Sequence, residues 1–230
     1  MKKIFIIGAS VSGMNIFQIL NDITANIKNE NEKYLIEGYI DENPELKGKK
    51  QFDKKIFIGF ESIKNKRFSD FYVISAIGDP MDRERLLNKS KKLGFKIDTV
   101  IHPSANVSPY AKIGKGVIIC QNCLIQPYAE IGDYCYIHAG CVIGPKVKID
   151  SSCTINSLVA ISANTHVEKR SYLGVGTSII QGMRIGEGSI IGANCVVVKP
   201  IPSHVTAVGI PAKVIREHPR ELWWSRKLWK

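Results

Sequence analysis

Aliphatic residues recur every six positions through the second half of the chain. Seventeen consecutive positions of this register, from Ile101 to Val197, are Ile, Val or Leu. A second position lies four residues after each, and fifteen of these seventeen are Ala, Val, Cys, Thr or Ser. Neither an α-helix nor a hairpin sheet has this period. A hexapeptide repeat with an aliphatic and a small inward position predicts a parallel β-helix over residues 101–202, whose stacked coils bury one continuous core.

Residues 1–100 show a different pattern, in which short apolar strands alternate with helical segments. Apolar runs predict strands over residues 2–8, 34–41 and 71–79. Apolar residues at helical spacing predict helices over residues 12–23 and 81–94, the second of which ends at a glycine. Because strands and helices alternate, this segment is predicted to be a small α/β domain with a parallel, Rossmann-like sheet.

The last segment, residues 203–230, combines basic residues with all three tryptophans of the chain. Two interpretations of this tail stay open. It forms either an amphipathic helix that touches a membrane or a partner, or a cap packed on the open end of the coil or on a neighbouring subunit.

Charge and hydropathy narrow the classes of partner. The chain has 230 residues and a net charge of +11 at pH 7, a balance that suits anionic partners but also a lysine-rich surface. Its lysines are dispersed, and no basic stripe interleaved with aromatics precedes the tail, so nucleic acid is not an expected partner. No apolar run is long enough to span a bilayer, and the first one breaks at Gly8 with no cleavage site after it. We therefore expect a cytoplasmic protein without a transmembrane segment.

The six cysteines are expected to be reduced thiols in such a chain. Five of them occupy the small inward position of the repeat, where they are predicted to pack as small hydrophobic residues. Cys120 and Cys123 have the spacing of metal ligands, but no second pair of cysteines or histidines completes a zinc set. No metal site is therefore predicted.

The motif "GASVSG" joins the first predicted strand to the first predicted helix. Backbone amides at such a junction, together with the helix N-terminus, can hold a phosphate. Ser10 stands where a dinucleotide-binding fingerprint has its middle glycine, so a tight packing turn is the alternative. The candidate nucleotide-binding residues in this motif are Gly8, Ala9 and Ser10.

Three further residues end predicted strands at the same edge of the sheet. Asp41 ends the second strand, where it either accepts hydrogen bonds from a base or ribose or forms a turn before the next segment. Gly78 and Asp79 end the third strand, and Asp79 either lines this edge or caps the following helix.

The order of several motifs resembles one group of acyltransferases. These motifs are "IFIIGASVSG", "GYIDENPELKGK", "AIGDPMDRERL", "IHPSANVSPYAKIGKGVII" and, after the repeat, "VGIPAKVI". They resemble the left-handed β-helix acyltransferases of the bacterial sialic-acid O-acetyltransferase and nucleotide-amino-sugar N-acetyltransferase subgroup, over nearly the whole chain. The resemblance implies a left-handed β-helix, a homotrimer, acetyl-CoA bound between neighbouring subunits, and a nucleotide-sugar substrate whose nucleotide binds the N-terminal sheet. Candidate CoA-binding residues are Gly174, Val175 and Gly176, where the backbone allows close approach, with Ala193 and Lys213.

The chain departs from this subgroup where catalysis is concerned. The subgroup usually carries a Glu-His pair, in which the histidine takes a proton from the substrate and the acid orients its ring. The unbroken register places this pair on Gly144 and Pro145, and a second histidine used near CoA on Thr154. His138 is therefore the candidate base, because it directly follows an aliphatic position and so points outward. Three hexads make a coil of 18 residues, so Asn156 lies directly above His138 and is the candidate to orient it or a substrate group.

Two other histidines have alternative interpretations. His166 is a second candidate base, although Lys148 and Arg184 above and below it indicate a solvated charged face. His102 is expected to be structural, at the join between the two segments.

We therefore expect acetyl transfer from acetyl-CoA to an amine of a nucleotide-linked sugar, by direct attack of the amine on the thioester, for surface-glycan synthesis. Two alternatives stay open. One is O-acetylation of a sialic acid or another sugar hydroxyl. The other is a non-catalytic nucleotide-sugar-binding protein, which the replacement of the Glu-His pair by Gly144 and Pro145 favours.

Overall fold

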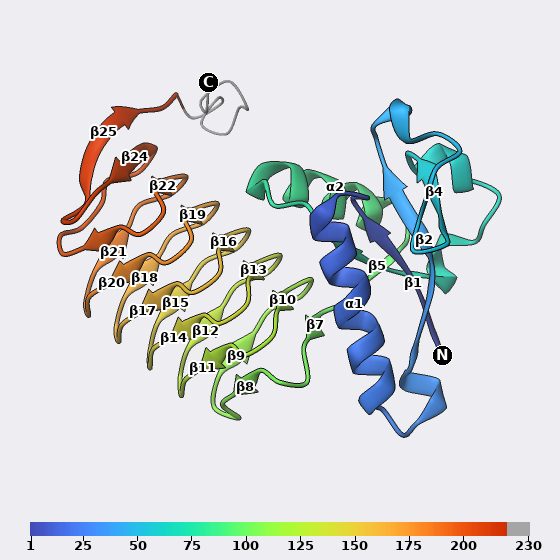
Figure 1. Ribbon diagram of the computed structural model, residues 1–230, viewed down its shortest axis with the longest axis horizontal. Coiled ribbons are helices and arrows are strands. Elements are labelled where there is room, and N and C mark those ends of the chain that lie inside the picture. Colours follow the sequence, from blue (N-terminus) through green and yellow to red (C-terminus); the bar gives the residue numbers. More distant parts are fainter. Residues whose placement is uncertain (220–230) are drawn as a thin grey trace. The chain divides into compact units, whose positions relative to one another are not determined.

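The computed structural model describes residues 1–219, which fall into two compact units. The first unit comprises Met1–Gly78 and Asp82–Pro103, and the second begins at Ser104 and includes Asp79–Met81. The first unit contains a six-stranded sheet, and each unit has its own core (Figure 1). The three tryptophans of the predicted tail lie outside the described residues.

The first unit is built on a six-stranded sheet in the order β3-β4-β2-β1-β5-β6. All neighbours in this sheet are parallel except β3 and β4, which form an antiparallel hairpin. β1 lies in the middle of the sheet, and Ile4, Phe5 and Ile6 are completely buried. The strands of this unit are β1 (Lys2–Ile7), β2 (Tyr34–Asp41), β3 (Lys50–Gln51), β4 (Lys54–Ile58), β5 (Tyr72–Ser75), β6 (Lys96–Ile97) and β7 (Val100–Ile101).

Both predicted helices are present, as α1 (Val11–Asn26) and α2 (Pro80–Lys92). The helical spacing in α1 places Ile16, Ile19 and Leu20 in the core. Four short 3-10 helices lie between the strands, at Glu30–Glu32, Pro44–Leu46, Phe60–Ile63 and Phe68–Asp70.

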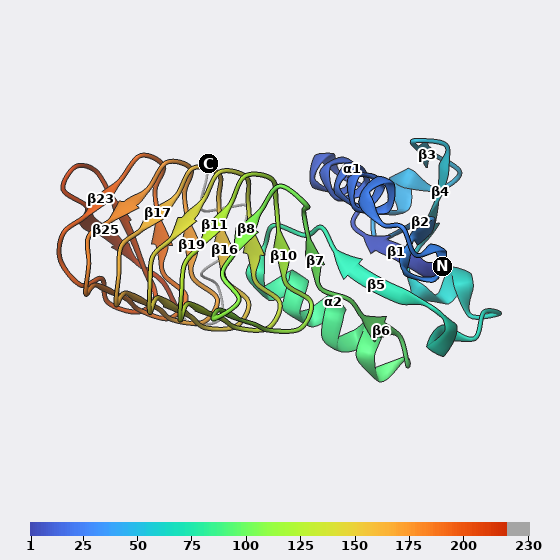
Figure 2. The ribbon, with the colours of Figure 1, turned by 90° about the horizontal axis from the view of Figure 1, so that it is seen from below.

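From Ser104 onward the chain winds into a left-handed β-helix of two-residue strands (Figures 1 and 2). Strands of successive coils pair in parallel and in register, so that Tyr136 lies opposite Thr154, 18 residues later. The strands are β8 (Asn106–Val107), β9 (Lys112–Ile113), β10 (Ile118–Ile119), β11 (Leu124–Ile125), β12 (Glu130–Ile131), β13 (Tyr136–Ile137), β14 (Val142–Ile143), β15 (Lys148–Ile149), β16 (Thr154–Ile155), β17 (Ala160–Ile161), β18 (His166–Val167), β19 (Tyr172–Leu173), β20 (Ser178–Ile179), β21 (Arg184–Ile185), β22 (Ile190–Ile191) and β23 (Val196–Val197).

These strands form three sheets, which are the three faces of the β-helix. The first face contains β7, β10, β13, β16, β19 and β22, the second runs from β8 through β11, β14, β17 and β20 to β23, and the third contains β9, β12, β15, β18 and β21. β24 (Val205–Val208) pairs in parallel with β22, and β25 (Lys213–Glu217) pairs with β24 as an antiparallel neighbour. The first face therefore continues past residue 202, into the segment that the sequence assigned to the tail.

The aliphatic register fills the interior of the coils, as the repeat predicts. Every register residue from Ile119 to Val197 is at most 3% exposed. Such stacked side chains bury a continuous apolar core that no single coil could bury by itself.

Side chains at the small inward position also form hydrogen bonds. A thiol or hydroxyl at this position donates to the backbone carbonyl of the residue fifteen positions later, which is the first residue of a turn in the next coil. Cysteine takes part as serine and threonine do, so the prediction that these cysteines pack only as small hydrophobic residues is incomplete. The pairs, at 3.0–3.2 Å, are Cys123 with His138, Cys135 with Asp150, Cys141 with Asn156, Cys153 with Glu168, Thr165 with Ile180, Ser171 with Gly186 and Thr177 with Gly192.

Candidate functional site

Most of the predicted catalytic and CoA-binding residues lie on one edge of the β-helix. The chain passes from the first face to the second through stacked turns at residues 138–141, 156–159, 174–177 and 192–195, which we call the site corner. The 18-residue coil brings to this corner candidates that are far apart in the sequence. They are His138, Asn156, Gly174, Val175, Gly176 and Ala193.

His138 opens the first turn of the site corner directly after β13. Its backbone N–H donates to Ile155 O at 2.8 Å, which fixes the residue to the next coil. The imidazole lies flat on the phenol ring of Tyr136, with 4.0 Å between ring centroids and 18° between ring planes. Tyr136 is completely buried and His138 is half-buried. The imidazole therefore has a rigid neighbour on one side and partial access to solvent.

Asn156 lies one coil above His138, as predicted, but its side-chain amide has a different partner. The Nδ2 group donates to Leu173 O at 2.7 Å, and the backbone N–H of Asn156 donates to the same oxygen at 3.0 Å. The amide N–H groups thus tie Asn156 to the following coil. This contact leaves the side-chain oxygen, an acceptor, as the group that suits the predicted role towards a substrate.

Two buried thiols hold the carbonyls of the predicted catalytic residues. Cys123 Sγ lies 3.0 Å from His138 O, and Cys141 Sγ lies 3.0 Å from Asn156 O. Contact with Cys123, together with burial, raises the pKa of Cys141 well above the ordinary value of a thiol, and the same contact lowers the pKa of Cys123. A carbonyl oxygen has no hydrogen to donate, so each sulfur keeps its proton and donates it at these distances.

The close stacking of the coils requires glycine at two positions of the site corner. A Cβ on Gly174 would lie 2.6 Å from Ala193 N, and a Cβ on Gly176 would lie 2.3 Å from Asn194 Oδ1. Gly176 also has a φ of 70°, which favours glycine. Close stacking of the next coil therefore explains these glycines, which the sequence assigned to close approach by CoA.

Gly144 and Pro145, which stand in place of the Glu-His pair, lie in the adjacent column of turns between the second and third faces. A Cβ on Gly144 would lie 2.8 Å from Ile161 O and 2.9 Å from Ala163 N. A glutamate therefore does not fit this corner unless the next coil shifts. The loss of the pair is built into the backbone packing, and is not only a change of side chain.

His166 belongs to a charged ladder on the third face. Its Nε2 atom lies 3.0 Å from Asp150 Oδ2, and Lys148 Nζ lies 3.5 Å from Asp150 Oδ1. The contact between Asp150 and His166 was not predicted from the sequence. The 18-residue coil places residue 148 beside residue 166, so it also places residue 150 within reach of the His166 ring. The pairs agree with the predicted solvated charged face.

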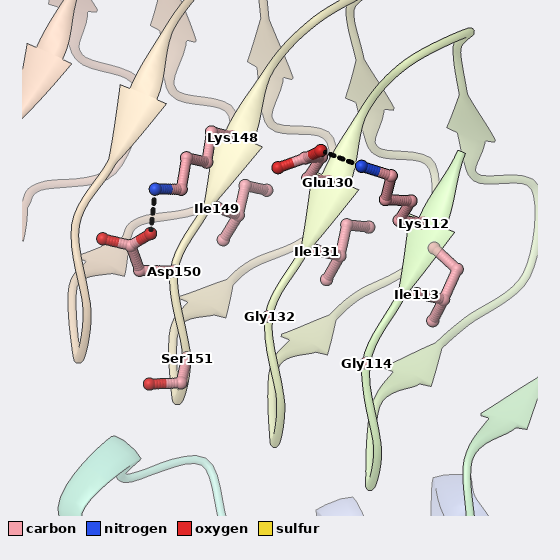
Figure 3. Close-up of a pocket in the computed structure, with 10 residues that line it drawn as sticks. All are labelled: Lys112, Ile113, Gly114, Glu130, Ile131, Gly132, Lys148, Ile149, Asp150 and Ser151. Atoms are coloured by element: carbon pink, nitrogen blue, oxygen red, sulfur yellow. Dashed lines mark hydrogen bonds and ion pairs between the residues drawn. The ribbon is translucent and has the colours of Figure 1, made fainter. Parts of the chain in front are cut away.

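Asp150 also lines a shallow groove of about 360 Å³ over β9, β12 and β15 (Figure 3). Lys112 pairs with Glu130 there at 2.7 Å, and Lys148 pairs with Asp150, so the groove has no excess charge of one sign among the residues that line it. It lies on the third face, whereas the site corner lies between the first face and the second.

The predicted nucleotide loop and Asp41 lie together at the edge of the first unit's sheet. Asp41 accepts the N–H of Ala9 at 2.8 Å on one oxygen and the N–H of Asn43 at 2.9 Å on the other. Gly8 has a φ of 100°, and Ser10 is the N-terminal cap residue of α1 without a side-chain cap bond. Asp41 therefore shapes the loop, in addition to any contact with a ligand.

Sequence reasoning missed the support of this loop by Gln51. This side chain is 9% exposed. With its amide oriented to satisfy both atoms, it donates to Ala9 O at 2.8 Å and accepts from Met14 N at 3.3 Å. No motif around Gln51 signals this role, because the contact depends on how β3 folds against α1.

Asp79 takes the helix-capping role that the sequence left open. Its Oδ1 atom accepts the N–H of Met81, at the start of α2, at 2.8 Å. The backbone carbonyl of Gly78 contacts Arg83, a completely buried residue that was not among the predicted site residues. The Arg83 guanidinium donates to Ile77 O at 2.8 Å and to Gly78 O at 3.2 Å.

Lys213 lies on β25 and is exposed. The preceding residue, Ala212, donates its N–H to Val196 O at 2.8 Å, so Lys213 is one residue away from a contact with β23. β23 follows the last turn of the site corner.

Residues 1–219 contain neither a metal-binding cluster nor a membrane-spanning helix. No group of three or more His, Cys, Asp or Glu side chains there is arranged to hold a metal ion. None of the helices in this part of the chain has the length and apolar character needed to cross a membrane.

Comparison with known sequences identifies the repeat. The family of bacterial transferase hexapeptides (six repeats) matches residues 98–133, and the hexapeptide repeat of succinyl-transferases matches residues 165–199. A Staphylococcus aureus protein named as a candidate acetyltransferase is 44% identical over 57 residues, which is 25% of this chain and 29% of that protein. The chain thus matches less than a third of the length of this curated relative.

Comparison with solved structures extends over most of the chain. A histidine-to-asparagine variant of perosamine N-acetyltransferase from Caulobacter crescentus, in complex with CoA and GDP-perosamine, has a TM-score of 0.85 and 28% identity, covering 94% of this chain and 98% of that one. The acetyltransferase domain of PglB from Neisseria gonorrhoeae shares the fold, with a TM-score of 0.82 and 24% identity over 94% of this chain and 100% of that one. The chain therefore carries hexapeptide repeats in two segments and shares its fold with left-handed β-helix acetyltransferases.

Proposed function

We propose that the protein transfers an acetyl group from acetyl-CoA to the amine of a nucleotide-linked amino sugar. The observation that carries this proposal is the similarity to perosamine N-acetyltransferase, which covers 94% of the chain and concerns a protein solved with CoA and GDP-perosamine. The site corner supplies candidates for CoA binding, and the loop of Gly8, Ala9 and Ser10 supplies candidates for the nucleotide. The acetylated nucleotide sugar would serve as a building block for surface glycans.

The reaction requires one bond to form and one to break. The amine nitrogen attacks the thioester carbonyl carbon, a C–N bond forms, the C–S bond breaks, and CoA leaves as a thiolate that takes up a proton. The attacking amine must lose a proton, and we assign His138 to accept it. Partial exposure of His138 allows this contact, while Tyr136 limits the movement of the ring.

His138 is assigned in preference to His166 because of where the two rings lie. His138 shares the site corner with the CoA-binding candidates, whereas His166 is paired with Asp150 on the third face. The perosamine enzyme holds CoA and GDP-perosamine even when one of its histidines is replaced by asparagine or alanine. By analogy, Pro145 in place of an expected histidine does not argue against ligand binding by this chain.

We further propose that the active form is a homotrimer in which the second face contacts a neighbouring copy. Exposed apolar side chains gather on this face and its corners, among them Val142 at 38%, Leu158 at 66%, Val175 at 47% and Ile180 at 44%. Apolar patches of this kind mark contact surfaces. Leu158 and Val175 belong to the site corner, so a neighbouring copy would border the site.

Mass spectrometry of reaction mixtures tests the proposed activity. The protein is incubated with acetyl-CoA and a panel of UDP-, dTDP- and GDP-linked 3-amino and 4-amino sugars. We expect one panel member to gain the mass of one acetyl group. Mass detection is preferred to a thiol assay because the protein has six cysteines of its own.

Each other outcome favours a different function. Binding of acetyl-CoA without any product would favour a hydroxyl acceptor, as in sialic-acid O-acetylation. Absence of both product and acetyl-CoA binding would favour a non-catalytic nucleotide-sugar-binding protein. The tight packing around Gly144, which leaves no room for the glutamate of the Glu-His pair, is consistent with this alternative.

A further inference from the structure

We propose that Cys123 is a positioning residue for His138, and that the proton on its thiol is the property that matters. This inference rests on the proposed function of His138 as the base. It assigns to a buried cysteine a role that neither the hexapeptide pattern nor its burial reveals.

The contacts of Cys123 restrict the peptide that presents the imidazole. Cys123 Sγ donates to His138 O at 3.0 Å from the preceding coil, and His138 N–H donates to Ile155 O at 2.8 Å in the following coil. The two hydrogen bonds fix the backbone of His138 from below and from above. The ring of Tyr136, 4.0 Å away between centroids, then limits the orientation of the side chain.

The β-helix does not need a donor at this position in order to form. Val159 occupies the equivalent place one coil before Gly174 and has no hydrogen to donate, yet the turn at 174–177 has the same backbone hydrogen bonds to its neighbours. Donors precede the two turns that begin with functional side chains, Cys123 before His138 and Cys141 before Asn156. A third donor, Thr177, precedes Gly192, so the pattern is a preference and not a rule.

Loss of the thiol proton should therefore affect the position of the imidazole more than the stability of the coil. Cys123→Ala removes the donor and leaves a small apolar group that this position accepts elsewhere in the repeat, as at Ala129. Cys123→Ser keeps a donor of similar size. The geometry thus allows the hydrogen bond to be tested separately from the volume.

The experiment compares three variants of the full chain. They are Cys123→Ala, Cys123→Ser and the control Cys135→Ala, whose thiol is equally buried and donates to Asp150 O at the same 3.0 Å but in a different column of turns. Three quantities are measured. Mass spectrometry gives kcat and KM for acetyl-CoA, and NMR gives the imidazole resonance of His138, which is identified by its loss in His138→Gln.

We expect Cys123→Ala to lower kcat by about three- to tenfold, the effect of one lost hydrogen bond, with KM little changed. The His138 resonance should shift in this variant, Cys123→Ser should restore both kcat and the resonance, and Cys135→Ala should alter neither of the two. An unchanged His138 resonance in Cys123→Ala, or an equal shift in Cys135→Ala, would overturn the proposal.

The resonance separates this inference from the assignment of the base. If His138→Gln keeps full turnover while Cys123→Ala still shifts the His138 resonance, Cys123 positions the ring but the ring is not the base. That result would remove His138 from the mechanism and leave the role of Cys123 in orienting it supported.

Discussion

His138 is the residue on which the proposed chemistry depends most directly. Replacement by glutamine keeps a polar side chain of similar length but removes the group that accepts the proton. General-base catalysis typically contributes a factor of about 10²–10⁴, so we expect kcat to fall at least about 100-fold in His138→Gln. The rate is measured by mass spectrometry with the sugar identified in the panel.

The matched control is His166→Gln, on the third face, which should leave kcat unchanged. The opposite result, with loss of turnover in His166→Gln and not in His138→Gln, would move the base to the Asp150–His166 pair. Either histidine variant should still bind acetyl-CoA, because neither ring is assigned to hold it.

Gly144 yields a prediction about stability at the level of a single Cβ atom. Its φ is not in the left-handed region, so the effect of Gly144→Ala is steric and arises from the 2.8 Å approach to Ile161 O. Overpacking of this kind costs about 1–3 kcal/mol of the free energy of unfolding. Urea unfolding measures this, with Ser162→Ala as the control, because residue 162 holds the same place one coil later and already carries a Cβ.

Equal stability of Gly144→Ala and the wild type would show that the next coil can shift at low cost. In that case Gly144 would no longer explain why the acid of the Glu-His pair is absent from this corner.

At the residue scale, sequence reasoning found positions better than partners. Asp41 and Ala9 were expected at one edge and do meet, at 2.8 Å, but the contact shapes the loop itself. Asn156 was placed correctly above His138, yet its amide donates to Leu173. Hydrogen-bond partners depend on side-chain torsions and on atoms of the next coil, and neither is encoded in the six-residue period.

The β-helix was predictable because its signal is repeated in every hexad. The same inward positions recur in each coil, so the period defined the core, the corners and the 18-residue stacking distance together. The edge strands β3 and β6 of the first unit, and the inner strand β4, were not predicted. β3 and β6 have only two residues each, so no apolar alternation marks them in the sequence.

We expect the stability of the hairpin of β24 and β25 to depend on pH. Burial lowers the pKa of His218, with Arg216 and His204 as further causes, and its Nε2 atom lies 2.6 Å from Thr206 Oγ1. The folded state therefore binds this proton less readily than the unfolded chain, whose histidine titrates near pH 6.5. The hairpin should be fully stable above this pH and should lose stability as the pH falls through it.

Thermal unfolding from pH 7.5 to 5.5 checks this expectation. The melting temperature of the wild type should fall over this range more steeply than that of His218→Gln, which cannot take up the proton. Parallel curves for the two proteins would assign the acid sensitivity to other groups.

For the whole molecule, the proposed trimer can be tested by one charge on the second face. Val142 is 38% exposed and lies within the apolar surface proposed as the contact, so Val142→Glu would bury a carboxylate at the subunit boundary. Light scattering after gel filtration should give three times the chain mass of 25.6 kDa for the wild type and a single chain mass for the variant. Val214→Glu, at a valine with 43% exposure on β25, should keep the wild-type mass. A wild type that is monomeric, or a Val142→Glu variant that keeps the full mass, would exclude the second face as the contact surface.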